Sequence, residues 1–224
     1  MIKYLLFDAD DTLFDFGKCE TTAFAVTCKQ YSLDNFLYND YCEINKALWR
    51  MFDLGEITKE KLVVERYVKL FALHEITVSP IDFNRDYLAN LGKCDYLLDG
   101  AEQICKDLHT KYDMYIITNG VESTQTARFL SSAIHDYFRD IFISEKIGYQ
   151  KPRKEYFDCV VNQTGINREE TLIIGDSLSS DIKGGNNSDI RTCWYNPAHK
   201  INTTDCKCDY IIHDLNELRG ILEI

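Results

Sequence analysis

Short apolar runs recur along the chain and predict the strands of a sheet. Each run is four or five residues long, too short for a helix, and helical or turn-rich stretches separate the later ones. The runs lie at residues 3–7, 114–118, 141–144, 171–175, 191–195 and 209–213. Strands that alternate with helices predict an α/β fold, here a Rossmann-like parallel sheet with helices on both faces.

Apolar residues at helical spacing predict the helices of this core. The clearest groups fall within residues 101–112, 157–164 and 215–222. We expect Asp99, beside Gly100, to cap the first of these helices, because its side chain can accept from the first backbone N–H groups. Pro152 suits the first turn of the second helix, where no backbone N–H is needed.

The stretch between the first and second strands follows a different pattern. It contains no strong strand run and predicts successive helices near residues 18–31, 36–53, 58–74 and 80–91. Thr58 follows the break at Gly55, and Pro80 is placed to start the last helix. We therefore predict an all-helical domain at residues 17–95, inserted into an α/β core made of residues 1–16 and 96–224.

Composition and charge narrow the possible partners. The net charge of −11 makes the chain a poor binder of nucleic acid or of an anionic membrane, and a phosphate site must supply its own local positive field. The nine cysteines show no C-x-x-C pair, which favours a reducing cytoplasm over a disulfide framework. We find neither a signal peptide nor a run of about 18 apolar residues, so we expect no membrane span.

The first strand ends in two aspartates placed for chemistry. Asp8 and Asp10 are two residues apart where the strand ends, and ligands of parallel sheets bind beyond the carboxyl ends of the strands. One carboxylate can serve as nucleophile and metal ligand while its neighbour holds a proton, because close like charges resist joint ionisation. A solvated acidic turn would show the same residues, so this pair needs support from other strand ends.

The second and third strands are followed by residues suited to a phosphate group. Thr118 and Asn119 lie at a strand-to-helix junction, where a hydroxyl, an amide and a helix N-terminus can bind phosphoryl oxygens. Lys151 follows the third strand and can neutralise such oxygens. Taken singly, the first pair fits an ordinary helix cap and Lys151 an ordinary surface lysine.

The fourth strand ends in Gly175 and Asp176, and Asp181 follows five residues later. Gly175 would let the chain turn closely, so that Asp176 faces the same crevice as Asp8. Asp181 could orient a metal-bound water, pair with Lys151 or cap a helix. Carboxylates and phosphate oxygens around an open position describe a magnesium site. Suitable residues at four separate strand ends make coincidence improbable.

With these residues the sequence resembles a haloacid dehalogenase-like phosphatase. The resemblance rests on Asp8, Asp10 and Thr12, then Thr118, Lys151, and Asp176 with Asp181, and it covers the whole core. It implies that Asp8 is the nucleophile and that Asp10 is the general acid and base. It further implies that Asp8, Asp10 (through its backbone carbonyl) and Asp176 hold Mg²⁺, that Thr118, Asn119 and Lys151 bind the phosphoryl oxygens, and that the helical insert is a cap.

A closer resemblance is to the pyrimidine 5′-nucleotidases of this superfamily. It rests on FDADDTLFDF, INKALW, GEIT, ISEKIGYQKP and GDSLSSDIKGGNN followed by TCWYN. It implies a nucleoside monophosphate as substrate. We also expect a monomer or weak homodimer. Asn45 and Trp49 share a helix face with Phe52 and are candidate contacts to a pyrimidine, although Trp49 and Phe52 fit the interior of the cap better.

Three alternatives stay open. A dehalogenase on the same core needs no Mg²⁺ and no acid at the position of Asp10, so Asp10 argues against it. A phosphatase or phosphomutase of this superfamily could instead act on a sugar phosphate or another small ester, and a phosphomutase would retain the aspartyl phosphate and shield it from water. A catalytically silent binding module belongs to a different class, and the intact set of acids with Lys151 argues against it.

Overall fold

The computed structural model describes residues 1–223 and contains a six-stranded sheet in which all adjacent pairs are parallel. The strands are β1 (Tyr4–Asp8), β2 (Asp113–Thr118), β3 (Asp140–Ile143), β4 (Thr171–Gly175), β5 (Arg191–Tyr195) and β6 (Tyr210–Ile212). Their order across the sheet is β3-β2-β1-β4-β5-β6. All six predicted strands are present, and the predicted α/β parallel fold is confirmed.

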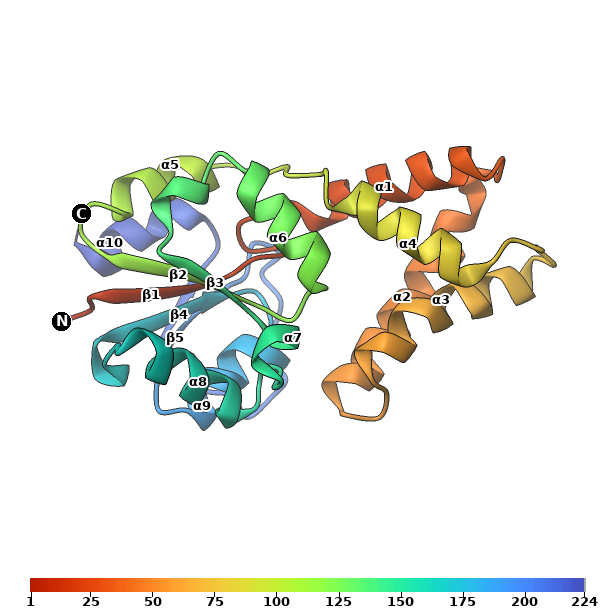
Figure 1. The fold of residues 1–224 in the computed structure, drawn as a ribbon. Coiled ribbons are helices and arrows are strands. Elements are labelled where there is room, and N and C mark those ends of the chain that lie inside the picture. The colour runs from red at the N-terminus through yellow and green to blue at the C-terminus, as the bar shows by residue number, and fades with distance from the viewer. Residues whose placement is uncertain (224) are drawn as a thin grey trace. The chain divides into compact units, whose positions relative to one another are not determined.

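Helices cover both faces of the sheet (Figure 1). They are α5 (Ala101–Leu108), α6 (Glu122–Ser131), α7 (Ser144–Ile147), α8 (Lys154–Thr164), α9 (Lys183–Asn187) and α10 (Leu218–Leu222). Successive residues of a strand point to opposite faces, and β1 shows this clearly. Leu5 and Phe7 pack with α5, α6 and α10, whereas Leu6 packs with α8. Two apolar interiors therefore hold β1 at the centre of the sheet, with its last residue, Asp8, at the edge where ligands bind.

The remaining long helices form a second compact unit. Residues Gly17–Cys94 cluster separately from Met1–Phe16 and Asp95–Ile224. Its helices are α1 (Phe16–Gln30), α2 (Tyr38–Asp53), α3 (Lys59–Leu73) and α4 (Pro80–Leu91). The side chain of Thr58 caps α3, and Ser79 caps α4 with Pro80 in the first turn. Both helix starts agree with the sequence prediction.

Two helix starts in the α/β unit differ from the sequence prediction. The N-cap of α5 is Gly100 and not Asp99, because the chain enters the helix through a left-handed residue with φ of 79°, which glycine adopts without strain. Helix α8 begins at Lys154 after Arg153, so Pro152 lies before the helix and not in its first turn.

No helix within residues 1–223 combines the length with the apolar character that a membrane span requires.

Candidate active site

The ends of three central strands meet at one edge of the sheet. Strand β1 lies between β2 and β4, with Asp8 in register with Ile117 and Phe7 in register with Ile174. The residues that follow these positions, Thr118 and Asp176 among them, are therefore brought to the same edge as Asp8. Lys151 reaches this edge from the loop before α8.

Three aspartates gather at this edge. Carboxylate oxygens of Asp8, Asp176 and Asp181 all lie within 4.8 Å of one another. Asp181 comes this close because Gly175 has no side chain: a Cβ on Gly175 would lie 2.3 Å from Oδ2 of Asp181. The backbone N–H of Asp176 donates to Oγ1 of Thr12 over 3.1 Å, which fixes the turn after β4.

Lys151 is buried inside this acidic cluster, with 1% of its surface exposed. Its Nζ atom donates to Oδ1 of Asp8 over 2.6 Å, to Oδ1 of Asp181 over 2.7 Å and to the carbonyl of Ile117 over 3.0 Å. Asp181 also accepts from the backbone N–H of Ser177. Of the roles considered for Asp181, the structure shows the pairing with Lys151.

Burial and crowding change the pKa values of the charged groups at this edge. Burial and the neighbouring Asp181 raise the pKa of Asp8 well above its ordinary value, against the opposing effect of Lys151. Burial, Asp181 and Asp11 likewise raise the pKa of Asp176 to about 8. Burial alone would lower the pKa of Lys151, but Asp181 and Asp8 outweigh it and raise the pKa above its ordinary value.

This cluster fits a hard divalent cation. When all three carboxylates are ionised, as a bound cation would favour, they and the one ammonium carry a net charge of −2, and every ligand atom that the acids offer is an oxygen. Mg²⁺ prefers one or two carboxylates with water and phosphate oxygens. Asp8 and Asp176 are the carboxylates best placed to hold it, because both oxygens of Asp181 already accept hydrogen bonds.

Thr118 and Asn119 occupy different environments although they are adjacent. Oγ1 of Thr118 accepts from Gly120 N–H and from Gln125, which leaves its own hydroxyl hydrogen for a ligand. The amide of Asn119 is engaged at both ends with the backbone of Lys151: Nδ2 donates to the Lys151 carbonyl and Oδ1 accepts from its N–H, each over 2.9 Å. In this structure the Asn119 side chain therefore holds Lys151 in place, where the resemblance implied a contact to phosphate.

The side chain of Asp10 is held apart from the acidic cluster. Its Oδ1 accepts from Nη1 of Arg128 and its Oδ2 from Nε2 of Gln125, each over 2.5 Å. Both partners belong to α6, and sequence reasoning missed them. The only local sign of their role is that Gln125 and Arg128 are three positions apart, on a face of α6 that packs inward.

The two residues suggested as substrate contacts lie in the helical unit. Asn45 is buried: its Nδ2 donates to Glu20 and its Oδ1 accepts from Nη1 of Arg66. Trp49 is half-buried and packs edge-on against Phe52, with ring centroids 5.5 Å apart. The side chains of Asn45 and Trp49 thus contribute to the interior of that unit. For Trp49 this agrees with the sequence interpretation that it packs with Phe52 inside the helical unit.

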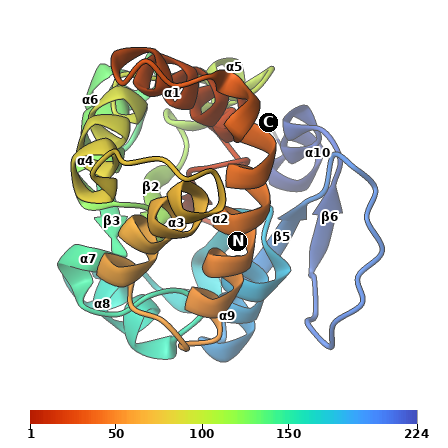
Figure 2. The same ribbon diagram turned by 90° about the vertical axis from the view of Figure 1, so that its right-hand side faces the viewer.

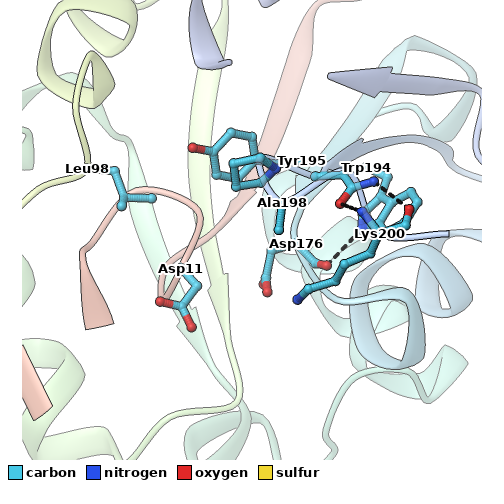
Figure 3. A pocket seen from close by; sticks show the side chains of 9 residues that line it. Asp11, Leu98, Asp176, Trp194, Tyr195, Ala198 and Lys200 are labelled. Carbon is cyan, nitrogen blue, oxygen red and sulfur yellow. Dashed lines mark hydrogen bonds between the residues drawn. The ribbon is translucent and has the colours of Figure 1, made fainter. Parts of the chain in front are cut away.

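A cavity of about 240 Å³ opens beside the cluster within the α/β unit (Figure 3). Asp11, Asp176 and Lys200 surround it, together with the two aromatic side chains at the end of β5 and apolar side chains of the segment after β5. Figure 2 shows this segment as the long connection that leads from β5 to β6. Burial and neighbouring acids raise the pKa of Asp11 to about 6, and Lys200 opposes the rise in pKa of both Asp11 and Asp176. The site therefore has room for part of a ligand next to Asp176.

The parallel sheet and the acids at its carboxyl edge define a hydrolase of the haloacid dehalogenase type. The family of haloacid dehalogenase-like hydrolases matches residues 5–195, most of the chain. The chain belongs to this family, and it is an enzyme.

Similar proteins cover the full length of the chain. A Bacillus subtilis protein named as a HAD-hydrolase, YfnB, is 39% identical over 99% of this chain and 96% of its own length. Its crystal structure with bound magnesium has a TM-score of 0.94, covering 100% of this chain and 99% of that one. The pyrimidine 5′-nucleotidases PynA of Streptococcus pneumoniae and YjjG of Escherichia coli are 37% and 30% identical, covering 99% and 98% of this chain and 95% and 97% of theirs.

Proposed function

We propose that this enzyme is a Mg²⁺-dependent phosphomonoester hydrolase that acts on pyrimidine nucleoside monophosphates through an aspartyl-phosphate intermediate. The observation that carries the proposal is that two acids only two positions apart in the sequence lie in different surroundings. Asp8 lies in the acidic cluster with Lys151, whereas Asp10 is held by Gln125 and Arg128. Two carboxyl groups in different environments can serve as nucleophile and as acid–base.

In the first step the Asp8 carboxylate attacks phosphorus and the bond to the ester oxygen breaks. Asp10 gives its proton to that oxygen, which leaves as an alcohol. The Thr118 hydroxyl holds one phosphoryl oxygen. Lys151, which Asn119 keeps in position, holds another by giving up one of its three hydrogen bonds to Asp8, Asp181 and the Ile117 carbonyl. In the second step the ionised Asp10 takes a proton from water, which attacks phosphorus and releases Asp8 and inorganic phosphate.

Asp8 and Asp176 would hold Mg²⁺, with Asp10 contributing its backbone carbonyl as the family resemblance implies. When bound, the ion offsets the negative charge that Lys151 leaves uncompensated and the charge of the phosphoryl group.

The choice of substrate rests on the relatives. PynA and YjjG are both named as pyrimidine 5′-nucleotidases, and each aligns with nearly the whole chain. We propose that the helical residues 17–95 form a cap over the core of residues 1–16 and 96–224, select the leaving group and exclude water. We further propose that the protein acts in the cytoplasm as a monomer or weak homodimer, which sedimentation of the purified chain tests.

Phosphate release from a panel of esters tests the function. The panel holds pyrimidine and purine nucleoside monophosphates and sugar phosphates, each assayed with Mg²⁺ and with EDTA. We expect uridine and thymidine monophosphates to react fastest and EDTA to abolish release. Preference for purines or sugar phosphates would refute the substrate proposal and leave the phosphatase chemistry intact, whereas full activity in EDTA would refute the Mg²⁺ dependence.

A further inference from the structure

The carboxylate of Asp10 is bound on both oxygens by one helix. Arg128 donates to Oδ1 and Gln125 to Oδ2, each over 2.5 Å, and both residues belong to α6. A carboxylate bound at one oxygen can still rotate about its side-chain bonds. One that is bound at both oxygens by donors on a rigid helix is restricted to one rotamer.

Arg128 is firmly placed. None of its surface is exposed, and its guanidinium carbon lies 4.6 Å from the ring centroid of Phe14. A buried guanidinium needs a compensating charge, which Asp10 supplies. The side chain of Asp10 remains 25% exposed, so a ligand can approach its carboxyl group although both oxygens accept hydrogen bonds from α6.

Gln125 connects Asp10 to the end of β2. It is 2% exposed, and its Nε2 atom also donates to Oγ1 of Thr118 over 3.1 Å. Gly120 makes room for this side chain: a Cβ on Gly120 would lie 2.1 Å from Nε2 of Gln125. The glycine of the Thr118–Gly120 turn is therefore required for Gln125 to reach Asp10.

We propose that Arg128 and Gln125 are positioning residues that hold the Asp10 carboxyl group toward the leaving oxygen and away from the acidic cluster. The inference deepens the proposed function and rests on Asp10 as the acid. Asp10 is only two residues from Asp8. A mobile Asp10 side chain would therefore be attracted to a cation held by Asp8 and Asp176. The guanidinium of Arg128 competes for that carboxylate and keeps proton transfer separate from the acidic cluster.

The dependence of rate on the leaving group tests this inference. A misplaced acid slows esters whose alcohol must be protonated and hardly affects p-nitrophenyl phosphate, whose leaving group departs as an anion. The alkyl ester is uridine 5′-monophosphate, or the sugar phosphate that the wild type cleaves faster. For Arg128→Met we expect kcat on the alkyl ester to fall by about 100-fold or more and kcat on p-nitrophenyl phosphate by less than about 10-fold. Arg128→Lys should recover part of the loss.

Gln125→Met is the second variant, because it keeps the length of the side chain and the charge of the site. It should give the same pattern with a smaller loss, which keeps the test valid if Arg128→Met fails to fold. Asp10→Asn is the reference and should show the strongest dependence on the leaving group. Equal losses on both esters in both variants, or no loss, would overturn the inference.

The controls separate this inference from the proposed function. If the wild type cleaves neither ester, the proposed function itself fails. If Asp10→Asn shows the dependence on the leaving group and the two α6 variants do not, only the positioning role is wrong.

Discussion

The Nζ atom of Lys151 lies 2.6 Å from Oδ1 of Asp8, although 143 positions separate the two residues in the chain. The same ammonium lies 2.7 Å from Asp181, so one cation is shared by two buried carboxylates while Asp176 lies close by. The crowding of these acids around one ammonium leads to the predictions on Asp8, Lys151, Mg²⁺ affinity and pH, and the interior of the helical unit leads to the prediction on Trp49.

Replacing Asp8 by Asn should abolish turnover without unfolding the protein. The amide cannot attack phosphorus, so we expect phosphate release to fall by more than about 1,000-fold. The melting temperature in EDTA should be unchanged or higher, because the variant has one fewer buried like charge. Asp158→Asn, which alters an acid of α8 that pairs with Lys154, is the control and should retain activity. Substantial hydrolysis by Asp8→Asn would exclude Asp8 as the nucleophile.

Replacing Lys151 by Met should destabilise the protein in EDTA. The buried carboxylates would lose their shared cation, and breaking a buried ion pair by removing one partner costs about 3–5 kcal/mol. Urea unfolding of the metal-free protein measures this change. Lys154→Met is the matched control: its partner Asp158 lies 2.8 Å away, but the two side chains are 51% and 37% exposed, so the loss should stay below about 1 kcal/mol. Similar losses in the two variants would contradict the central role of Lys151.

The affinity for Mg²⁺ should rise with pH. Burial raises the pKa of Asp176 to about 8, and a protonated carboxyl group is a poor ligand, so binding must release a proton below that pH. Calorimetric titrations in buffers of different ionisation enthalpy would count the proton released. An affinity that does not change between about pH 6 and about pH 9 would be incompatible with this cause.

The same raised pKa predicts how pH affects stability. The folded, metal-free protein keeps a proton on Asp176 that the unfolded chain releases near its ordinary pKa of about 4. This contribution to stability is therefore present at low pH and is lost as the pH rises through about 8. Mg²⁺ binds the ionised form, so its effect on the melting temperature should be larger at about pH 9 than at about pH 6.

Trp49→Ala should change stability and leave the preference among nucleotides unchanged. The half-buried indole packs against Phe52, and removing it should cost about 2 kcal/mol, less than for a fully buried tryptophan. Phe52→Ala, at a residue only 4% exposed, is the matched control and should cost more. If Trp49→Ala altered the ratio of pyrimidine to purine hydrolysis and Phe52→Ala did not, Trp49 would be a substrate contact.

Residues that act through their neighbours in sequence were predictable. The strands follow from runs such as Thr171–Gly175, whose apolar residues need burial on both faces. The helix starts at Thr58 and Pro80 likewise depend on backbone groups within the first turn. The predictions that Asp99 caps α5 and that Pro152 lies in the first turn of α8 were wrong. The exact start of a helix depends on the backbone angles of the residues that enter it, and here those residues are Gly100 and Arg153.

By itself the sequence determined the order of elements, the parallel sheet, and the acids and lysine at the strand ends, because these depend on the local alternation of apolar and polar residues. Only the tertiary structure decided how those side chains pair. Arg128 holds Asp10 across 118 positions, and Asn119 binds the backbone of Lys151 across 32. Such partners are set by the register of β2 beside β1 and by the packing of α6 on the sheet, which no spacing along the chain encodes. The separate environments of Asp8 and Asp10 therefore came from the fold, although both residues stood out in the sequence.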